Sequence, residues 1–300
     1  MRFIFLFIFQ AIALGIFSQP ITGEVPIHFG QTFNNPQINP ARGGSKAMLE
    51  LFAGTRRSNE KFAGIATSAF SVFVRVNSSD KGFNVLGMHF NNDQEGPFIS
   101  RNRGYISYAR HQKIGDNCFF SGGVSFGLYS FGVKANPAYN AGASGNTMDG
   151  NGGVFLYTPK TRLGLAVNQF SNPKVQPILD IIQLNRHYTL VVEQKIRFNE
   201  SFLMMPSFFV RYIEKNQNKY MPDLASGVAV NFLLSGMVSF GASYENKEGF
   251  YSFLGLQNVC VACEGRKKGD VSGLSVDFSY FMPNRSNYRT NTQTFEMVLR

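Results

Sequence analysis

Apolar and polar residues alternate with a period of two along most of the chain, from about Met48 to the C-terminus. The alternation is clearest in segments 186–198, 236–246 and 268–282, where large apolar side chains share one face of an extended strand. Such alternation is typical of β-strands whose two faces meet different environments. The sequence therefore predicts an all-β protein.

About fourteen segments show this pattern, and most have ten or more residues. Strands of globular proteins have about 5–6 residues, whereas tilted membrane strands need about 9–11. Short connections such as Pro159-Lys160 and Asn199-Glu200 alternate with longer predicted loops at Asn136–Gly150 and Ser171–Asn185. Short turns on one side and long loops on the other are typical of outer-membrane barrels. The predicted strands are residues 47–57, 63–76, 83–91, 99–114, 117–134, 151–158, 161–170, 186–198, 201–214, 221–234, 236–246, 249–259, 268–282 and 291–300.

The second face of these strands distinguishes a membrane barrel from the main alternative, a secreted β-sandwich. The exposed face of a sandwich would be rich in Lys and Glu, but here it holds mainly Gly, Ser, Thr, Ala and Asn. Scattered charges can pair across a barrel lumen, whereas a charge facing lipid costs about 2–4 kcal/mol near the midplane. We therefore predict a single transmembrane antiparallel β-barrel over residues 47–300 in the outer membrane. The charges on these faces include Glu50, Arg75, His89, Arg211, Asp277 and Glu296.

Composition narrows the class of protein further. The chain has 31 Phe, 30 Gly and no Trp, with 44% hydrophobic and 16% charged residues, which is too apolar for a disordered protein. The mean hydropathy is −0.10, and beyond the N-terminus no apolar run approaches the ~18 residues of a membrane helix. The net charge is +10. At a barrel rim, Arg56-Arg57 and Arg266-Lys267-Lys268 favour phosphates of outer-membrane lipids or solvated turns, and no nucleic-acid partner is expected.

The N-terminus predicts a targeting sequence followed by an irregular segment. Residues 1–18 join one positive charge to a short apolar stretch and match a secretory signal peptide; a single membrane anchor is the alternative. Residues 19–46 are rich in Pro, Asn and Gly, and Asn34-Asn35-Pro36 and Asn39-Pro40 predict successive turns. This stiff segment is a candidate cap or plug of the barrel, or else an ordinary turn leading into the first strand.

Motifs for catalysis are not found in the sequence. It contains neither G-x-S-x-G nor H-E-x-x-H, so we expect no enzymatic activity, no cofactor and no metal. A hydrolase built around a strand-borne histidine such as His187 is a minor alternative. Cys260 and Cys263 have C-x-x-C spacing without a second pair; they are candidates for a small loop disulfide, for two loop cysteines without a role, or for a metal or redox pair.

Several motifs, in order, resemble those of the PorP/SprF proteins, which are outer-membrane barrels of the type IX secretion system of Bacteroidota. The chain departs from them at Arg42, where the family has Tyr, and at Phe295, where the family has His. The matching segments are Phe33–Gly44, Leu86–Pro97, Arg186-His187-Tyr188, Leu203–Phe208 and Thr292–Leu299.

The resemblance implies a non-enzymatic role in secretion and cell-surface attachment of proteins that carry a type IX C-terminal domain. Some members serve gliding adhesins and link cargo to periplasmic ring or motor components, so these are the expected partners; a passive or small-solute channel is the alternative function. Asn92-Asp93 and Gly96-Pro97 are expected in the loop between the third and fourth strands. The motif residues taken as structural or interaction candidates are Asn34, Asn35, Pro36, Asn39, Pro40, Asn92, Asp93, Gly96, Pro97, Arg186 and His187.

Overall fold

The computed structural model describes residues 36–58, 66–135, 142–176, 182–214, 223–246, 249–259, 274–283 and 292–299. Nearly all of these residues lie in antiparallel strands, so the predicted all-β class is confirmed. One short 3-10 helix, η1 (Pro40–Arg42), precedes the first strand. The described residues contain no helix that is both long enough and apolar enough to cross a membrane. The predicted signal peptide, residues 1–18, lies outside the described residues.

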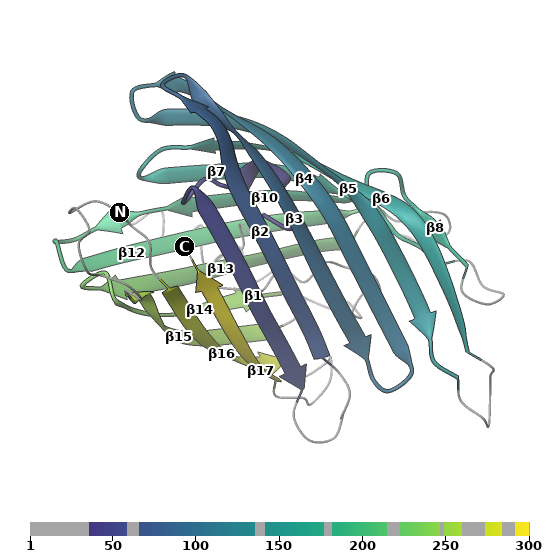
Figure 1. Ribbon diagram of the computed structural model, residues 1–300. Coiled ribbons are helices and arrows are strands. Elements are labelled where there is room, and N and C mark those ends of the chain that lie inside the picture. The colour runs from purple at the N-terminus through teal and green to yellow at the C-terminus, as the bar shows by residue number, and fades with distance from the viewer. Residues whose placement is uncertain are drawn as a thin grey trace.

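Within the described ranges, fourteen strands of eight or more residues each pair with two neighbours (Figure 1). The pairings follow the chain from β1 to β7, pass from β7 to β10 and on to β12, and continue to β17, which pairs with β1. They therefore run in a complete ring of antiparallel strands, as a barrel requires. The fourteen strands are β1 (Leu49–Ser58), β2 (Ala66–Ser79), β3 (Gly82–Glu95), β4 (Ile99–Gly115), β5 (Cys118–Val133), β6 (Ala143–Tyr157), β7 (Thr161–Asn168), β10 (His187–Gln194), β12 (Phe202–Ile213), β13 (Asp223–Leu234), β14 (Val238–Glu245), β15 (Gly249–Val259), β16 (Leu274–Pro283) and β17 (Thr292–Leu299).

Three two-residue strands complete the fold. Strand β11 (Ile196–Arg197) follows β10 after a break at Lys195 and continues the pairing with β12. Strands β8 (Lys174–Val175) and β9 (Ile182–Gln183) form a small hairpin in the connection between β7 and β10, and they pair only with each other.

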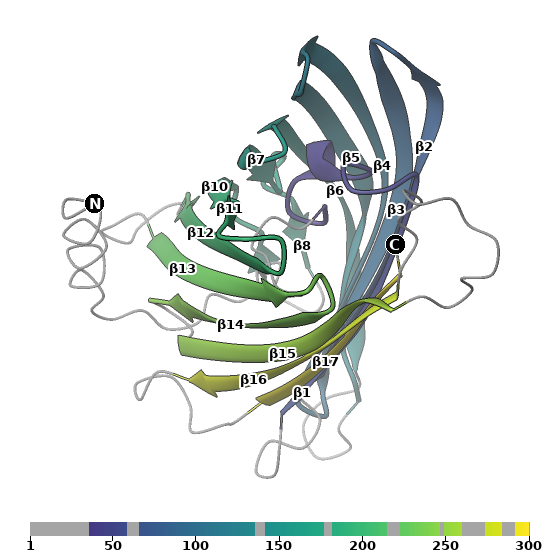
Figure 2. The ribbon, with the colours of Figure 1, turned by 90° about the vertical axis from the view of Figure 1, so that its left-hand side faces the viewer.

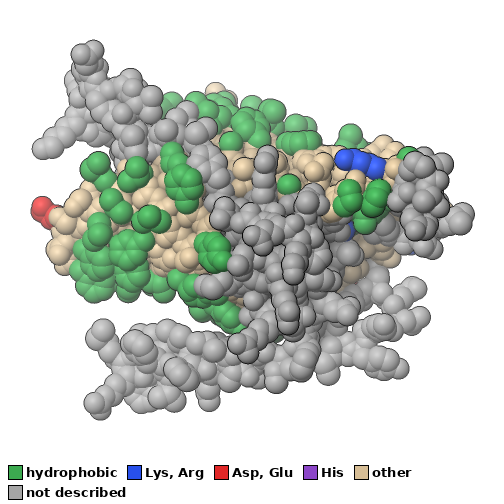
Figure 3. Space-filling view, turned by 90° about the horizontal axis from the view of Figure 1, so that it is seen from below, with side chains coloured by type: hydrophobic (Ala, Val, Ile, Leu, Met, Phe, Trp, Pro, Cys, Tyr) green, Lys and Arg blue, Asp and Glu red, His purple; other side chains and the backbone are tan. Residues whose placement is uncertain are grey.

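The two faces of the strands differ as the alternation predicted. On β5, Phe126 and Leu128 are exposed on the outer face, whereas Ser125 and Tyr129 are buried on the inner face. Figure 3 shows hydrophobic side chains gathered on the outer surface with few charged ones among them. An apolar outer band around a polar interior is what lipid demands of a transmembrane barrel.

The connections differ between the two ends of the barrel. At one end, here the turn end, connections of two to four residues follow β2, β4, β6, β11 and β13, and one longer connection, 260–273, follows β15. The other end, here the loop end, holds the longer connections 134–142 and 169–186, with Gly96–Phe98 and 246–248 as short exceptions. Strand β1 begins and β17 ends at the turn end.

Two predicted strand boundaries were wrong. The range Asn136–Gly150 was predicted as a loop, but β6 begins at Ala143, and Ala143–Gly150 pairs with β5 throughout. Asn92 and Asp93 were predicted in a loop, but they lie within β3 and pair with β2 and β4. The turn begins instead at Gly96, whose φ of 73° suits a residue without a side chain. In both cases turn-forming residue types are held in strands by the neighbouring strands.

Candidate functional site

A buried, hydrogen-bonded polar region lies inside the barrel, around residues 36–46, here named the inner segment. Figure 2 shows η1, in purple, on the inner side of the sheet beside β5 and β6. Gln37, Ile38, Asn39, Ala41 and Arg42 have exposed fractions of 0–3%. Although it is largely polar, this part of the chain is therefore as buried as a protein core.

The inner segment owes its local shape to Asn39 and Pro40. The Asn39 side-chain Oδ1 accepts a hydrogen bond from the Ala41 N–H at 3.1 Å and so caps η1. Pro40 occupies the first helical position, where its fixed φ is suitable and its missing N–H costs nothing. The Arg42 N–H then donates to the Asn39 carbonyl at 3.0 Å, which closes the turn.

One side of the inner segment is hydrogen-bonded to β6 and β7. Asn39 Nδ2 donates to the backbone carbonyls of Val154, at 3.0 Å, and Leu165, at 3.3 Å. In the reverse direction, Asn168 Nδ2 donates to the Ile38 carbonyl at 2.8 Å. These bonds fix the height of the segment along the barrel wall, because each one joins it to a particular ladder position.

Two glycines make room for this contact. At Gly123 on β5, a Cβ would lie 2.5 Å from the Ala41 backbone nitrogen and 2.6 Å from its Cα. At Gly153 on β6, a Cβ would collide with the Asn39 side-chain amide. Only residues without a side chain let the inner segment approach the wall so closely.

Near the turn end, His111 and Arg75 hold the carboxyl-terminal part of the segment. His111 Nε2 lies 2.9 Å from the Gly43 carbonyl oxygen. Because a carbonyl can only accept, Nε2 carries the proton, and Nδ1, 3.0 Å from the Tyr157 hydroxyl, accepts from it. Arg75 Nε donates to the Gly44 carbonyl at 2.6 Å.

The strands that follow β7 around the ring contact the inner segment through apolar side chains. Ile38 forms a buried cluster with Val191 on β10, Phe209 on β12, and Ala225 and Ala229 on β13. Arg75 on β2 and Phe209 on β12 are seven strands apart in the ring of fourteen. The inner segment therefore crosses the lumen, from the hydrogen bonds of Arg75 and His111 to the apolar contacts of Ile38.

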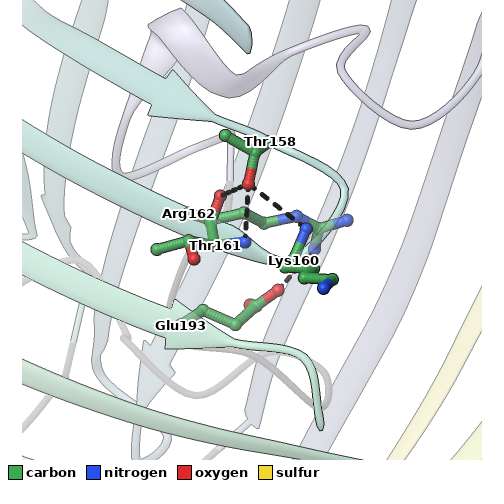
Figure 4. Close-up of polar contacts among 5 residues, drawn as sticks. All are labelled: Thr158, Lys160, Thr161, Arg162 and Glu193. Atoms are coloured by element: carbon green, nitrogen blue, oxygen red, sulfur yellow. Dashed lines mark hydrogen bonds and ion pairs between the residues drawn. The ribbon is translucent and has the colours of Figure 1, made fainter. Parts of the chain in front are cut away.

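A buried ion pair lies on the same inner wall near the turn end. Arg162 on β7 donates to the carboxylate of Glu193 on β10, its direct ladder partner (Figure 4). The Glu193 side chain is only 1% exposed. The tight β6–β7 turn places Arg162: Thr158 Oγ1 accepts from the N–H groups of Lys160, at 3.2 Å, and Thr161, at 2.9 Å. The pair supplies charge compensation inside the lumen.

A second polar cluster lies in the loop-end half of the lumen. The Tyr105 hydroxyl donates to Asp149 Oδ2 at 2.5 Å across Gly127, the residue of β5 that pairs with both. Arg101 lies 3.8 Å from Asp93, which also accepts a hydrogen bond from Thr67 Oγ1 at 2.7 Å.

The β8–β9 hairpin covers the lumen face above this cluster. Val175 and Leu184 are buried against Tyr129 and Phe131, both on the inner face of β5. The lumen is thus occupied near the turn end by the inner segment and near the loop end by this hairpin.

The structure places the residues that the sequence singled out in separate regions. Pro36, Asn39 and Pro40 lie in the inner segment. On β3, Asn92 donates a hydrogen bond from Nδ2 to Asn102 Oδ1 at 2.6 Å. The next residue, Asp93, belongs to the polar cluster at the loop end, where it accepts from Thr67. Asn34, Asn35, Cys260 and Cys263 lie outside the described residues.

The remaining predicted residues lie at the loop end. Gly96 and Pro97 form the β3–β4 turn. Arg186 donates from Nη2 to the Phe170 carbonyl at 2.7 Å and lies 3.3 Å from the Glu214 carboxylate, so it joins two loop-end connections. His187 is the first residue of β10 and is buried. These residues are not brought together with Asn39 into one site.

Sequence reasoning missed the residues that hold the inner segment from the wall. His111, Asn168, Gly123 and Gly153 carry no motif, and each meets the segment across a large sequence distance. Arg75 was recognised only as one of the charges on the polar strand faces.

In the part of the chain that the structure describes, no three His, Cys, Asp or Glu side chains are grouped so as to hold a metal ion.

Comparison with known proteins identifies the family of this barrel. Residues 22–299 match the family described as type IX secretion system membrane protein PorP/SprF. The chain belongs to this family, and it is an outer-membrane β-barrel component of the type IX secretion system. No curated protein sequence matches the chain.

Solved structures with a similar arrangement of strands are outer-membrane barrels. The translocator domain of the autotransporter NalP from Neisseria meningitidis has a TM-score of 0.44 at 10% identity, with 85% of this chain and 88% of that chain covered. A FadL homologue from Pseudomonas aeruginosa has a TM-score of 0.47 at 9% identity, covering 84% and 88%. The toluene transporter TodX from Pseudomonas putida has a TM-score of 0.48 at 10% identity, covering 89% and 92%.

Proposed function

We propose that this barrel is a non-enzymatic adaptor of the type IX secretion system. In this role it supports the secretion and cell-surface attachment of proteins with a type IX C-terminal domain, gliding adhesins among them, and links them to periplasmic ring or motor components. The observation that carries the proposal is the inner segment, which crosses the lumen from β2 and β4 to β10, β12 and β13. A barrel filled in this way is suited to hold partners at its two ends.

The contacts of the inner segment favour an adaptor over a passive channel. A net hydrogen bond contributes about 1 kcal/mol, and the segment makes such bonds through Asn39, Asn168, His111 and Arg75. Burial of an isoleucine side chain such as Ile38 adds about 1.5–3 kcal/mol. Together these terms hold the segment against both walls, whereas a channel for solutes needs a continuous open path.

The two ends of the barrel suit different partners. In outer-membrane barrels the short turns face the periplasm and the longer loops face the outside. In that orientation the turn end, with the start of β1, faces periplasmic ring or motor components. The loop end, with the connections 134–142 and 169–186, faces the secreted protein.

Co-purification from native outer membranes tests the adaptor role. The tagged full-length protein is expected to recover a surface protein with a type IX C-terminal domain and a periplasmic ring component. A second outer-membrane barrel carrying the same tag serves as the control. Recovery of neither partner, under conditions in which the barrel stays folded, would count against the proposal.

Conductance in planar bilayers separates the adaptor from the channel. The purified protein is expected to show no steady open pore, because the inner segment crosses the lumen and would obstruct it. A stable, large conductance in the wild-type protein would support the channel instead. Hydrolysis of lipids or esters that is lost in His187→Ala would support the hydrolase alternative.

A further inference from the structure

Strand β6 extends well beyond its neighbour β7 at the loop end. The β6–β7 ladder stops at the pair Gly152–Val167, and β7 ends at Asn168. The chain leaves β7 through Gln169 and Asn172, whose φ angles of 55° and 47° are left-handed and incompatible with a strand. Residues 143–149 of β6 therefore pair with β5 on one side and have no ladder partner among the described residues on the other.

One hydrogen bond shows which backbone groups face this open side. The Gly150 carbonyl accepts from the Phe170 N–H at 3.1 Å, on the side of β7. Along a strand the N–H and C=O of alternate residues point to the same side. The backbone groups of Ser144, Asn146 and Met148 therefore face the open side, while the residues between them bond to β5.

Nothing in the residue types of this edge protects it. Natural sheet edges are usually blunted by charged side chains, proline, a bulge or a covering loop. Residues 143–148 read Ala-Ser-Gly-Asn-Thr-Met, without a charge or a proline. The ladder with β5 is regular along them. Among the described residues, this stretch is an uncharged strand edge that could pair with another strand.

The open edge stands beyond the apolar band of the barrel. On the outer face of β5 the residues change from Phe126 and Leu128 to Ser130. On β6 they change in the same way, from Met148, which is 76% exposed, to Asn146 and Ser144. Because polar outer positions lie above the hydrocarbon layer, lipid does not cover this edge.

The inner face of the edge is supported by the β8–β9 hairpin. A Cβ at Gly145 would lie 2.7 Å from a Val175 side-chain carbon, so β8 passes directly over the lumen face of β6 there. The hairpin forms a separate two-stranded sheet and does not pair with β6. A strand added beside Ser144–Met148 would therefore lie next to a packed surface and not over an empty lumen.

We propose that the edge formed by residues 143–148 of β6 binds an extended segment of the secreted protein by strand addition; this rests on the adaptor function proposed above. The exported polypeptide is the occupant that the geometry favours, because the edge lies at the loop end and above the lipid band. Backbone hydrogen bonds from the open-side residues supply the binding. The bound segment is extended and uncharged, with an apolar side chain where it passes Met148.

A proline at Asn146 tests the edge directly. Asn146→Pro removes an N–H that points to the open side, and proline is tolerated where the lost N–H is not part of a ladder. Asn146→Ala keeps the N–H and is the matched control. The probe is a purified secreted protein from the same bacterium that carries a type IX C-terminal domain, added to the full-length barrel in nanodiscs. Asn146→Pro is expected to weaken its binding about tenfold, and Asn146→Ala to leave it unchanged.

Hydrogen–deuterium exchange locates the contact independently of affinity. The backbone amides of Ser144, Asn146 and Met148 are expected to become protected when the probe binds. Retained heat-modifiable migration on gels shows that the variant is folded, and the pair Ser144→Pro and Ser144→Ala replaces the first pair if Asn146→Pro does not fold.

The outcomes separate this inference from the adaptor role. Binding of the probe without protection of residues 143–148 overturns strand addition and leaves the adaptor role standing. No binding of the probe, together with no recovery of partners from native membranes, overturns both. Protection of the edge in the barrel alone, with the mass of a dimer, assigns the edge to a second copy of this chain and overturns the proposed occupant.

Discussion

Asn168, the last residue of β7, donates a hydrogen bond of 2.8 Å to the backbone carbonyl of Ile38, 130 positions earlier in the chain. The side chain of Ile38 packs on the next strands of the ring, against Val191 and Phe209. A single residue of the inner segment thus joins β7 to β10 and β12 through both its backbone and its side chain. Substitutions around it are expected to change the stability of the barrel and the closure of the lumen together.

Removing the Asn39 amide is expected to loosen the inner segment. Asn39→Ala loses the η1 cap and the bonds to Val154 and Leu165. Asn39→Asp keeps the oxygen that caps η1 but replaces the donating NH2 group with a second oxygen, which would face the carbonyls of Val154 and Leu165. Oxygen facing oxygen is repulsive, so we expect this substitution to be the more destabilising of the two. We expect Asn39→Ala to lower the free energy of unfolding by about 1–3 kcal/mol, because buried polar groups lose their hydrogen-bond partners. Thermal unfolding and bilayer conductance measure the effect. If the Asn39→Asp variant behaved like the wild-type protein in both, this account would be contradicted.

Gly123 and Gly122 provide a matched pair of neighbours on β5. Gly123→Ala places a Cβ against the Ala41 backbone, whereas Gly122 has nothing within 4 Å of its Cβ position. Overpacking typically costs about 1–3 kcal/mol, so Gly123→Ala is expected to lower the unfolding temperature and to displace the inner segment. Gly122→Ala is expected to behave as wild type. Equal effects of the two substitutions on stability and conductance would argue against a tight fit at Ala41.

Removing one member of the Arg162–Glu193 pair is expected to destabilise the barrel more than removing the charge of both. Arg162→Met leaves Glu193 buried without its cation, a situation that costs about 3–5 kcal/mol. Adding Glu193→Gln to that variant is expected to recover much of the loss, because the stranded charge is removed. Denaturant unfolding of the two single variants and the double variant measures the coupling. Additive losses would show that the two side chains do not interact.

The depth of the outer face can be probed along a single strand. Val124 and Ser130 both face outward on β5, Val124 within the apolar band and Ser130 beyond it. Val124→Arg is expected to cost about 2–4 kcal/mol, and Ser130→Arg about 0–1 kcal/mol, since the penalty depends on depth. Folding into bilayers of known thickness gives both values. A reversed order would mean that the membrane band is placed differently along β5.

The sequence predicted the strands wherever one face is apolar, as on β5 and β14. There, lipid on one side and the lumen on the other require apolar and polar residues to alternate, and this alternation is visible in the sequence. It failed for the first half of β6, where Gly145, Asn146 and Asp149 resemble a loop and only the ladder with β5 keeps the chain extended. Asn92 and Asp93 misled in the same way. Local residue preferences cannot show a strand that is maintained by its neighbours.

The candidate site was predictable on one side only. Asn39 and Pro40 carry a turn pattern that can be read locally, and they form the capped turn of η1. The groups that receive them, Gly123, Gly153, His111 and Asn168, are ordinary residues of strands whose pairing brings them to the same height in the lumen. Their role depends on register across the whole ring, which no local pattern contains.

The position of the inner segment directly before β1 has a consequence for assembly in the membrane. The barrel is completed by the pairing of β1 with β17, the first strand with the last. The segment tethered to β1 is then held at a high effective concentration beside the wall that receives it. The inner segment is therefore delivered to the lumen by the same chain that builds the wall.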